Sequence, residues 1–205
     1  MTRQPIAVMA SGRGTNLAAV LEAANSSSYP VDVHVVISNK IDAPALQIAR
    51  DAGVPIVLFI DPKKYSDRSS YDLACAQQIE KHQCQWVVLA GYMRILSPHF
   101  VERFKHRLIN IHPALLPSFP GEDGVTSALA YGVKVSGCTV HLVNEEVDGG
   151  PILAQAIVPV LDDDSRESLH QRIQVEEYRL YPDTIRRLVE CGFQLDGRKV
   201  IWNAS

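Results

Sequence analysis

Asn110 and His112 lie two residues apart in a mostly apolar stretch, INIHPALLP, which covers residues 109–117. In an extended strand, side chains two residues apart point to the same face. An asparagine amide can donate a hydrogen bond to an oxygen that gains negative charge, and a histidine can hold or transfer a proton. The two residues are therefore either a satisfied polar pair in a protein core or part of a reaction centre.

Asp148 is a candidate partner for this histidine, because it lies in the turn EEVDGG of residues 145–150. A carboxylate beside an imidazole orients the ring and stabilises its charged form. Together, Asn110, His112 and Asp148 would make a centre for acyl transfer without a nucleophile. The nearest hydroxyl, Ser118, is not in a GxSxG sequence, which argues against a Ser–His–Asp hydrolase. Taken alone, the histidine could be structural and the aspartate a solvated turn residue.

Residues 11–16, SGRGTN, place two glycines directly after an apolar run and at the start of a predicted helix. Such a turn lets the backbone approach an anion, and the helix N-terminus adds N–H groups and a positive dipole end. An ordinary tight turn is the alternative. Leu17 takes the third glycine position of a GxGxxG pattern and no Gly-Lys-Ser/Thr follows. A single phosphate therefore fits better than a dinucleotide or a nucleoside triphosphate.

The segment AGYMRILSP, residues 90–98, is an apolar loop after another predicted strand. Its residues Met93, Ile95 and Leu96 belong either to the core or to an apolar slot for a flat ring system. Arg68 lies in the first turn of a predicted helix, where the helix dipole disfavours a cation. It could bind a carboxylate through two hydrogen bonds, although a surface arginine is the default.

These segments follow strands in an alternation of strands and helices. Apolar, valine-rich runs predict strands at residues 6–10, 31–38, 54–59, 86–91 and 108–112. Helices are predicted over residues 15–27, 42–53 and 66–83, the second of them capped by Asp42 and ended by Gly53. The alternation indicates an α/β protein with a Rossmann-like, doubly wound, mostly parallel sheet. Such sheets bind ligands at the carboxyl ends of their strands, so segments 11–16, 91–96 and 110–117 are expected to meet in one crevice.

After residue 120 the pattern changes to antiparallel strands. A short helix is predicted over residues 124–131, and strands are predicted over 137–144 and 150–160, with a connection too short for a parallel crossover. Ser165 is expected to cap a long amphipathic helix. Glu177 lies on that helix, where most glutamates are simply solvated. The chain is expected to end in a hairpin around Asp196-Gly197 and to form a single domain.

Composition excludes several classes of function. Apolar residues make up 46% of the chain and charged residues 21%, which is typical of a soluble globular protein. The formal charge of −3 argues against nucleic acid or an anionic membrane as a partner. The apolar run at 6–10 is too short for a signal peptide, and no stretch reaches transmembrane length. Cys75, Cys84, Cys138 and Cys191 are too scattered for a zinc site, so we expect reduced thiols in a cytoplasmic protein without a metal.

Four motifs resemble the phosphoribosylglycinamide formyltransferases of the folate-dependent formyltransferase family. They are SGxGTN, AGYMRILSP, NIHPALLPSFPG and VDGGPILAQ, and the resemblance covers essentially the whole chain. It implies transfer of a formyl group from 10-formyltetrahydrofolate, a co-substrate, to the amine of N1-(5-phospho-D-ribosyl)glycinamide in de novo purine biosynthesis. It also implies small-molecule substrates, a cytoplasmic monomer or homodimer, and one formyltransferase domain over residues 1–205. In that domain, residues 1–105 would bind the phosphoribosyl group and residues 106–205 would carry catalysis and folate binding.

The resemblance also assigns roles to individual residues. The implied catalytic residues are Asn110, His112 and Asp148. The implied contacts to the ribonucleotide are Gly14, Thr15, Asn16 and Glu177, and the implied folate contacts are Arg68, Met93, Arg94, Ile95, Leu96 and Asn110. The chain departs from the family at one position, because many members read PG-x-H where this sequence has Glu122-Asp123 after Pro120-Gly121. We still expect activity, without any auxiliary role for a histidine there.

Two other functions remain open at this point. A formyltetrahydrofolate hydrolase would use water in place of the amine and would share the same Asn–His–Asp set. A non-catalytic protein that binds folate or a phosphoribosyl group is the other alternative. An assay of folate release with and without the amine substrate separates these possibilities.

Overall fold

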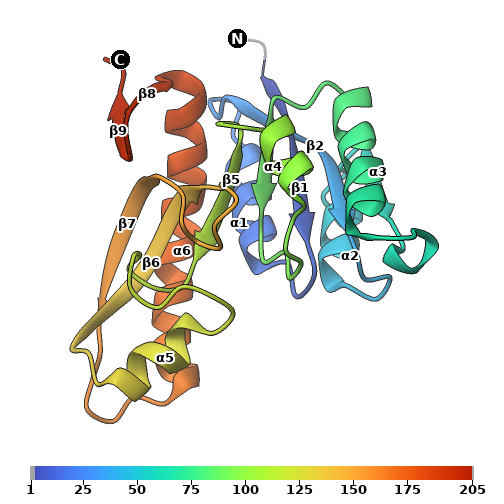
Figure 1. Cartoon of the computed structure of the whole chain (residues 1–205). Helices are drawn as coiled ribbons and strands as arrows, with labels where there is room; N and C mark the ends of the chain where they lie inside the picture. Colours follow the sequence, from blue (N-terminus) through green and yellow to red (C-terminus); the bar gives the residue numbers. More distant parts are fainter. Residues whose placement is uncertain (1–2, 205) are drawn as a thin grey trace. The chain divides into compact units, whose positions relative to one another are not determined.

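The structure is a computed structural model that describes residues 3–204. The chain divides into two compact units, residues 1–109 and residues 110–205. Figure 1 shows the helices and strands of both units, coloured along the sequence.

Four parallel strands form the sheet of the first unit, in the order β3-β2-β1-β4. Their bounds are β1 Gln4–Ala10, β2 Val31–Ser38, β3 Ile56–Phe59 and β4 Trp86–Leu89. The chain first moves outward from β1 to β3 and then returns to place β4 on the other side of β1. The carboxyl ends of β1 and β4 therefore flank the topological switch point at which doubly wound sheets bind ligands.

Helices alternate with these strands, as predicted. They are α1 Thr15–Ala24, α2 Pro44–Asp51, the 3-10 helix η1 Pro62–Lys64, α3 Arg68–Lys81 and α4 Pro98–Arg103. The prediction that Asp42 caps α2 is wrong, because Pro44 is the first helical residue and Ala43 therefore takes the N-cap position. The sequence pattern does not predict η1 and α4, which are too short to show a hydrophobic period.

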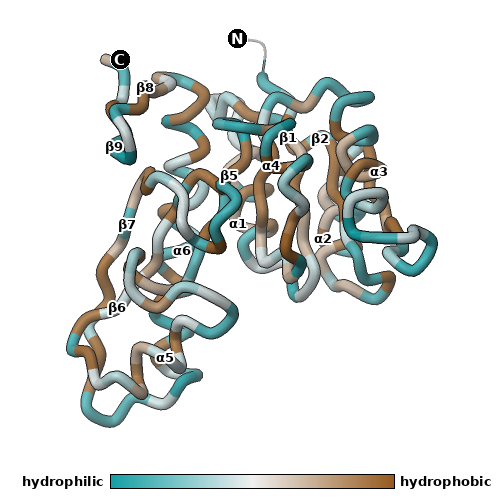
Figure 2. The backbone as a smooth tube through the Cα atoms, in the orientation of Figure 1, coloured by the Kyte–Doolittle hydropathy of each residue, from teal (hydrophilic) through white to brown (hydrophobic). Residues whose placement is uncertain are grey.

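The core of the first unit is built from the apolar runs of its strands. Residues 6–10 of β1 are fully buried, and so are Val35, Val36 and Ile37 of β2. Parallel strands that are covered on both faces have continuous apolar runs rather than an alternating pattern. Hydrophobic residues accordingly follow the strands, whereas the connecting turns are mostly hydrophilic (Figure 2).

The second unit combines antiparallel strands with one long helix. β5 Leu108–His112 begins in the first unit and ends in the second. The other elements are α5 Gly124–Tyr131, β6 Val135–Leu142, β7 Ile152–Pro159, α6 Arg166–Glu190, β8 Phe193–Asp196 and β9 Lys199–Trp202. As predicted, β6 pairs with β7 and β8 pairs with β9 in antiparallel register. α6 packs against both β6 and β7 (Figure 1).

Ser165 caps α6 as predicted. Its hydroxyl accepts a hydrogen bond from Ser168 N at 3.2 Å, and the Ser168 hydroxyl accepts one from Ser165 N at 3.0 Å. This reciprocal pair is a capping box. The parallel strands of the first unit and the antiparallel strands of the second confirm the predicted α/β fold class. Across residues 3–204, no helix is both long and apolar enough to cross a membrane.

Candidate active site

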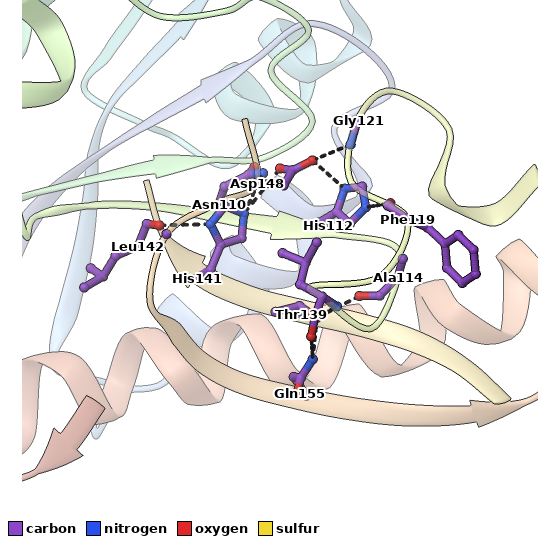
Figure 3. A network of polar contacts seen from close by, with 12 residues as sticks. Asn110, His112, Ala114, Phe119, Gly121, Thr139, His141, Leu142, Asp148 and Gln155 are labelled. Atoms are coloured by element: carbon purple, nitrogen blue, oxygen red, sulfur yellow. Dashed lines mark hydrogen bonds and ion pairs between the residues drawn. The ribbon is translucent and has the colours of Figure 1, made fainter. Parts of the chain in front are cut away.

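β5 ends in the two polar residues that the sequence singles out. His112 is buried, with 4% of its surface exposed. Its Nε2 lies 2.8 Å from the carbonyl oxygen of Phe119, and its Nδ1 lies 3.3 Å from Oδ2 of Asp148 (Figure 3). Both ring nitrogens therefore face acceptor oxygens. Only the doubly protonated, positively charged ring can donate to both of them.

Asp148 reaches this ring from the turn between β6 and β7. Its backbone is in the left-handed region, with φ 52°. The two glycines that follow are sterically required. A Cβ on Gly149 would lie 2.6 Å from Cβ of Glu146, and a Cβ on Gly150 would lie 1.7 Å from the carbonyl oxygen of Leu142. A left-handed aspartate held by such a turn is a strained arrangement of the kind that persists at functional sites.

The surroundings of Asp148 stabilise its charge. Burial alone would raise the pKa of this carboxyl, whose side chain is 10% exposed. Hydrogen bonds from His141 and the Gly121 N–H, together with the nearby His112 ring, instead hold the pKa below its ordinary value. The Gly121 N–H donates to Oδ2 at 2.8 Å. An ionised carboxylate therefore faces the His112 ring at neutral pH and orients it.

His141 belongs to the same cluster, although sequence reasoning did not identify it. Its Nε2 lies 3.3 Å from Nδ2 of Asn110 and 3.5 Å from Oδ1 of Asp148 (Figure 3). The residue is buried inside β6, which is the usual place of a structural histidine. A signal was present, because Thr139 and His141 repeat in β6 the two-residue polar spacing of Asn110 and His112. The four polar side chains of the cluster thus come from β5, β6 and the turn that follows β6.

The loop after His112 is anchored on β6 and β7. The Thr139 hydroxyl donates to the carbonyl oxygen of Ala114 at 2.7 Å and accepts from Leu116 N at 3.0 Å. Gln155 Nε2 donates to the carbonyl oxygen of Leu116 at 2.9 Å and to the Thr139 hydroxyl at 3.0 Å. Figure 3 shows this group of contacts beside the His112 cluster. The backbone that leaves β5 is therefore held by side chains of two other strands, the buried Thr139 of β6 and the exposed Gln155 of β7.

In the first unit, Gly14, Thr15 and Asn16 form the start of α1. Gly14 is the N-cap and has φ 77°. A Cβ at this position would lie 2.8 Å from Cα of Ala45, so only glycine fits. Since Gly14 has no side chain that could cap the helix, the first N–H groups of α1 can bind an anion. This geometry suits the predicted phosphate site.

Two of the three segments that were predicted to share a crevice lie side by side in the first unit. Ser11 N donates to the carbonyl oxygen of Gly91 at 3.1 Å, and Met93 N donates to the Ser11 hydroxyl at 2.8 Å. These bonds join the loops after β1 and β4, the neighbouring strands at the switch point. The third segment, residues 110–117, belongs to the second unit, so its place in the crevice stays a prediction.

The loop after β4 presents apolar side chains at its surface. Met93 and Ile95 are 66% and 63% exposed, whereas Leu96 is buried. Met93 and Ile95 are therefore not core residues, and for them the alternative of an apolar slot for a ring system remains. Exposed neighbouring apolar side chains of this kind commonly mark a ligand-binding surface.

A buried carboxylate on α3 holds the same loop. Oδ2 of Asp72 accepts a hydrogen bond from Ser97 N at 2.6 Å. Burial raises the pKa of Asp72, while the Ser97 donors and the charge of Arg94 oppose that rise. The guanidinium of Arg94 lies over the ring of Tyr71, 4.7 Å from its centroid. The candidate folate-binding loop is therefore fixed to α3 by hydrogen-bond, charge and cation–π contacts.

Arg68 and Glu177 are the remaining candidates. Arg68 is the first residue of α3 and is exposed. Glu177 is 4% exposed on α6, so the default of a solvated glutamate is wrong for it. A buried glutamate requires compensating contacts, so Glu177 does more than make the helix surface soluble.

The remaining groups to place in residues 3–204 are the side chains that commonly bind metal ions and the cysteines. Within this range, no group of three or more histidine, cysteine, aspartate or glutamate side chains could hold a metal ion. Cys75, Cys84 and Cys138 are free thiols and are buried. Burial raises the pKa of these three thiols to about 12, so they stay protonated and serve as core residues.

Comparisons with known proteins show which family this chain is similar to. Residues 4–185 match the family described as formyl transferase. A phosphoribosylglycinamide formyltransferase from Mycobacterium tuberculosis is 46% identical over 193 residues, which cover 94% of this chain and 88% of that protein. The crystal structure of glycinamide ribonucleotide transformylase 1 from Symbiobacterium toebii matches with a TM-score of 0.95 and 44% identity, over 98% of this chain and 95% of that chain. A formyltetrahydrofolate deformylase from Pseudomonas syringae is more distant, with a TM-score of 0.89 and 30% identity, over 99% of this chain and 67% of its own.

Proposed function

This chain belongs to the formyl transferase family, and from that premise we propose that Asn110, His112 and Asp148 form its catalytic centre. Like the phosphoribosylglycinamide formyltransferases that it matches, it is an enzyme of formyl transfer in purine biosynthesis. Its substrates are small molecules, and its family uses a formyltetrahydrofolate as co-substrate. The proposal concerns which residues of this chain carry the reaction and how.

The reaction that we assign is direct transfer from N10 of 10-formyltetrahydrofolate to the amine of N1-(5-phospho-D-ribosyl)glycinamide. The amine nitrogen attacks the formyl carbon and gives a tetrahedral intermediate with a negatively charged oxygen. The bond from that carbon to N10 then breaks, the amine loses one proton, and N10 gains one. The intermediate forms on no side chain, so the enzyme needs to supply only charge stabilisation, orientation and proton transfer.

Each catalytic side chain has a role that its contacts support. Asn110 donates through its amide to the developing oxygen, and the charged form of His112 stabilises the same oxygen. Asp148 orients His112 through the 3.3 Å contact to Nδ1 and relays protons. The single observation that carries the proposal is the position of Asp148. Its two carboxylate oxygens lie against His112 and His141, and Asn110 lies against the same His141.

Most of the residues to which we assign ligand binding lie in the first unit or on α6. We assign the ribonucleotide phosphate to the start of α1, at Gly14, Thr15 and Asn16, and a further ribonucleotide contact to Glu177. We assign the folate ring system to the loop after β4 at Met93, Arg94, Ile95 and Leu96, and the folate tail to Arg68. We assign a further folate contact to Asn110. The exposed apolar side chains of that loop and the glycine N-cap of α1 support these assignments.

An assay of folate release tests the reaction. Release of tetrahydrofolate from 10-formyltetrahydrofolate is measured with and without N1-(5-phospho-D-ribosyl)glycinamide. We expect release only with the amine, matched by the formation of N-formyl product. Equal release without the amine would make the enzyme a hydrolase, and tight binding without turnover would make the chain a binding protein.

The remaining assignments concern the compartment, the metal requirement, the oligomeric state and the partners of the enzyme. We propose a cytoplasmic enzyme that works without a metal ion, as a monomer or homodimer, and that does not use nucleic acid or a membrane. Free cysteines suit a reducing compartment. Retention of turnover after exhaustive treatment with a chelator would support the metal-free reaction, and loss that is restored by a divalent cation would contradict it.

A further inference from the structure

Asp123 occupies the position at which many members of the family carry a histidine, and in this chain it caps α5. Its carboxylate accepts hydrogen bonds from Thr126 N at 3.2 Å and from the Thr126 hydroxyl at 2.7 Å. Its carbonyl oxygen accepts from the Ser127 hydroxyl at 2.9 Å. Arg166, the first residue of α6, donates to the same carboxylate through Nε at 3.2 Å. The start of α5 is therefore fixed by one residue, mainly through its carboxylate.

The helix that Asp123 starts lies against the catalytic histidine. Gly124 is the first residue of α5, and a Cβ at this position would lie 2.9 Å from Nε2 of His112 and 3.1 Å from the carbonyl oxygen of Phe119. The backbone of α5 therefore packs directly on the ring and on its acceptor. A shift of this helix start by a fraction of an ångström changes what the ring contacts.

The loop before Asp123 supplies backbone groups to two catalytic side chains. The Phe119 carbonyl oxygen lies 2.8 Å from His112 Nε2, and the Gly121 N–H donates to Asp148 at 2.8 Å. Phe119 has φ 57°, a conformation that a bulky residue adopts only when its surroundings impose it. Its ring also packs edge-on against Tyr131, the last residue of α5, at 5.7 Å between centroids. The first residue of α5, Gly124, and its last residue, Tyr131, therefore both contact Phe119 of this loop.

We propose that Asp123 is a positioning residue for the His112–Asp148 pair, which acts by capping α5 and thereby fixing the loop of residues 119–121. This inference rests on the proposed catalytic role of His112. The hydrogen bonds that cap α5, rather than the charge of Asp123, are responsible for this positioning. The ion pair with Arg166 joins two side chains that are 41% and 47% exposed, and exposed pairs contribute little. Asparagine caps helices as well as aspartate does, whereas alanine does not.

The test compares three substitutions by steady-state kinetics. We expect Asp123→Ala to lower kcat roughly 10-fold or more and to leave KM for both substrates within about twofold, because displacement of catalytic groups costs turnover rather than binding. Asp123→Asn should restore kcat to within about threefold of the wild type, since it keeps the cap. Arg166→Ala, which removes only the ion pair, should behave like Asp123→Asn. If the alanine variant does not fold, Asp123→Gly removes the same side chain at a position that tolerates glycine.

Two controls separate the possible failures. Asp61 caps η1 by accepting from Lys63 N at 3.0 Å, so Asp61→Ala removes an aspartate cap of the first unit and should leave kcat unchanged. His112→Ala tests the catalytic assignment on which the inference rests. Near-wild-type turnover of His112→Ala would overturn that assignment. An inactive His112→Ala together with an unchanged kcat of Asp123→Ala, or with equal losses in Asp123→Asn and Asp123→Ala, would overturn only the role of Asp123.

Discussion

Oδ2 of Asp148 lies 3.3 Å from Nδ1 of His112 while it also accepts the Gly121 N–H at 2.8 Å. The carboxylate is thus held by a backbone donor as well as by the ring. Since the aspartate is further fixed by its left-handed backbone and by the two glycines that follow, the turn after β6 sets the orientation of the histidine. A buried ring with acceptors on both nitrogens is suited to carry a positive charge toward a developing oxyanion.

Asp148→Asn should leave the fold intact and reduce turnover. The amide keeps the size of the side chain but removes the charge that stabilises and orients the His112 ring. We expect kcat to fall roughly 10²–10⁴-fold, the range of a lost general acid–base function, with smaller changes in KM. Asp163→Asn is the matched control, because Asp163 is exposed at the surface. A kcat of Asp148→Asn within threefold of the control would contradict the assignment.

Asn110→Ala should remove one donor to the oxyanion. Loss of a single such donor typically costs about 10²–10³-fold in kcat, so we expect a decrease in this range. The melting temperature should change little, because Asn110 is only partly buried and its side-chain amide contacts a single imidazole, that of His141, in Figure 3. Asn25→Ala, an exposed position at the end of α1, is the control. Unchanged turnover in Asn110→Ala would show that the developing charge is stabilised elsewhere.

Much of the fold was predictable because it depends on local patterns. β5 and α5 have the predicted bounds, Leu108–His112 and Gly124–Tyr131, since each apolar run ends at a clear proline or glycine signal. The α/β class and the formyl transfer function are likewise confirmed. The predicted N-cap of α2 is wrong because the helix begins at Pro44, so the residue before it, Ala43, takes the N-cap position that was expected for Asp42. Elements as short as η1 have no period that a sequence could reveal.

The candidate site was only partly predictable, because its contacts are not local. The pairing of His112 with Asp148 could be anticipated from residue types and strand ends. For His141 the sequence offers only the two-residue polar spacing with Thr139, because its contact with Asn110 depends on how β6 is placed and its own neighbours are those of a core strand. Glu177 is buried although its helix is mostly polar, and only the packing of α6 decides this. Tertiary placement, rather than propensity, decides the burial of Glu177 and the contacts of His141.

Gly150→Ala should destabilise the turn that carries Asp148. A Cβ there would lie 1.7 Å from the carbonyl oxygen of Leu142, a distance that forces the backbone to move. We expect the free energy of unfolding to fall by about 2–4 kcal/mol, as for other strained substitutions, and turnover to fall with it. Gly12→Ala is the control, because a Cβ at that glycine has no neighbour within 4 Å. Its free energy of unfolding should change by less than about 1 kcal/mol. Urea titrations of both variants provide the measurement, and equal effects would contradict the steric explanation.

Asp164 should make the stability of the fold depend on acidic pH. A hydrogen bond from Arg172 holds the pKa of this carboxyl at about 2, compared with an ordinary value of 3.8, and Leu161 N also donates to it at 2.7 Å. Because the folded-state pKa is depressed, the stabilisation is fully present above the ordinary value and is lost as the pH falls toward 2. Asp164→Asn should therefore unfold at lower urea than the wild type at pH 7, and the difference should shrink between pH 4 and pH 2. Asp163→Asn is again the control, and a difference that stays constant over that range would exclude Asp164 as its source.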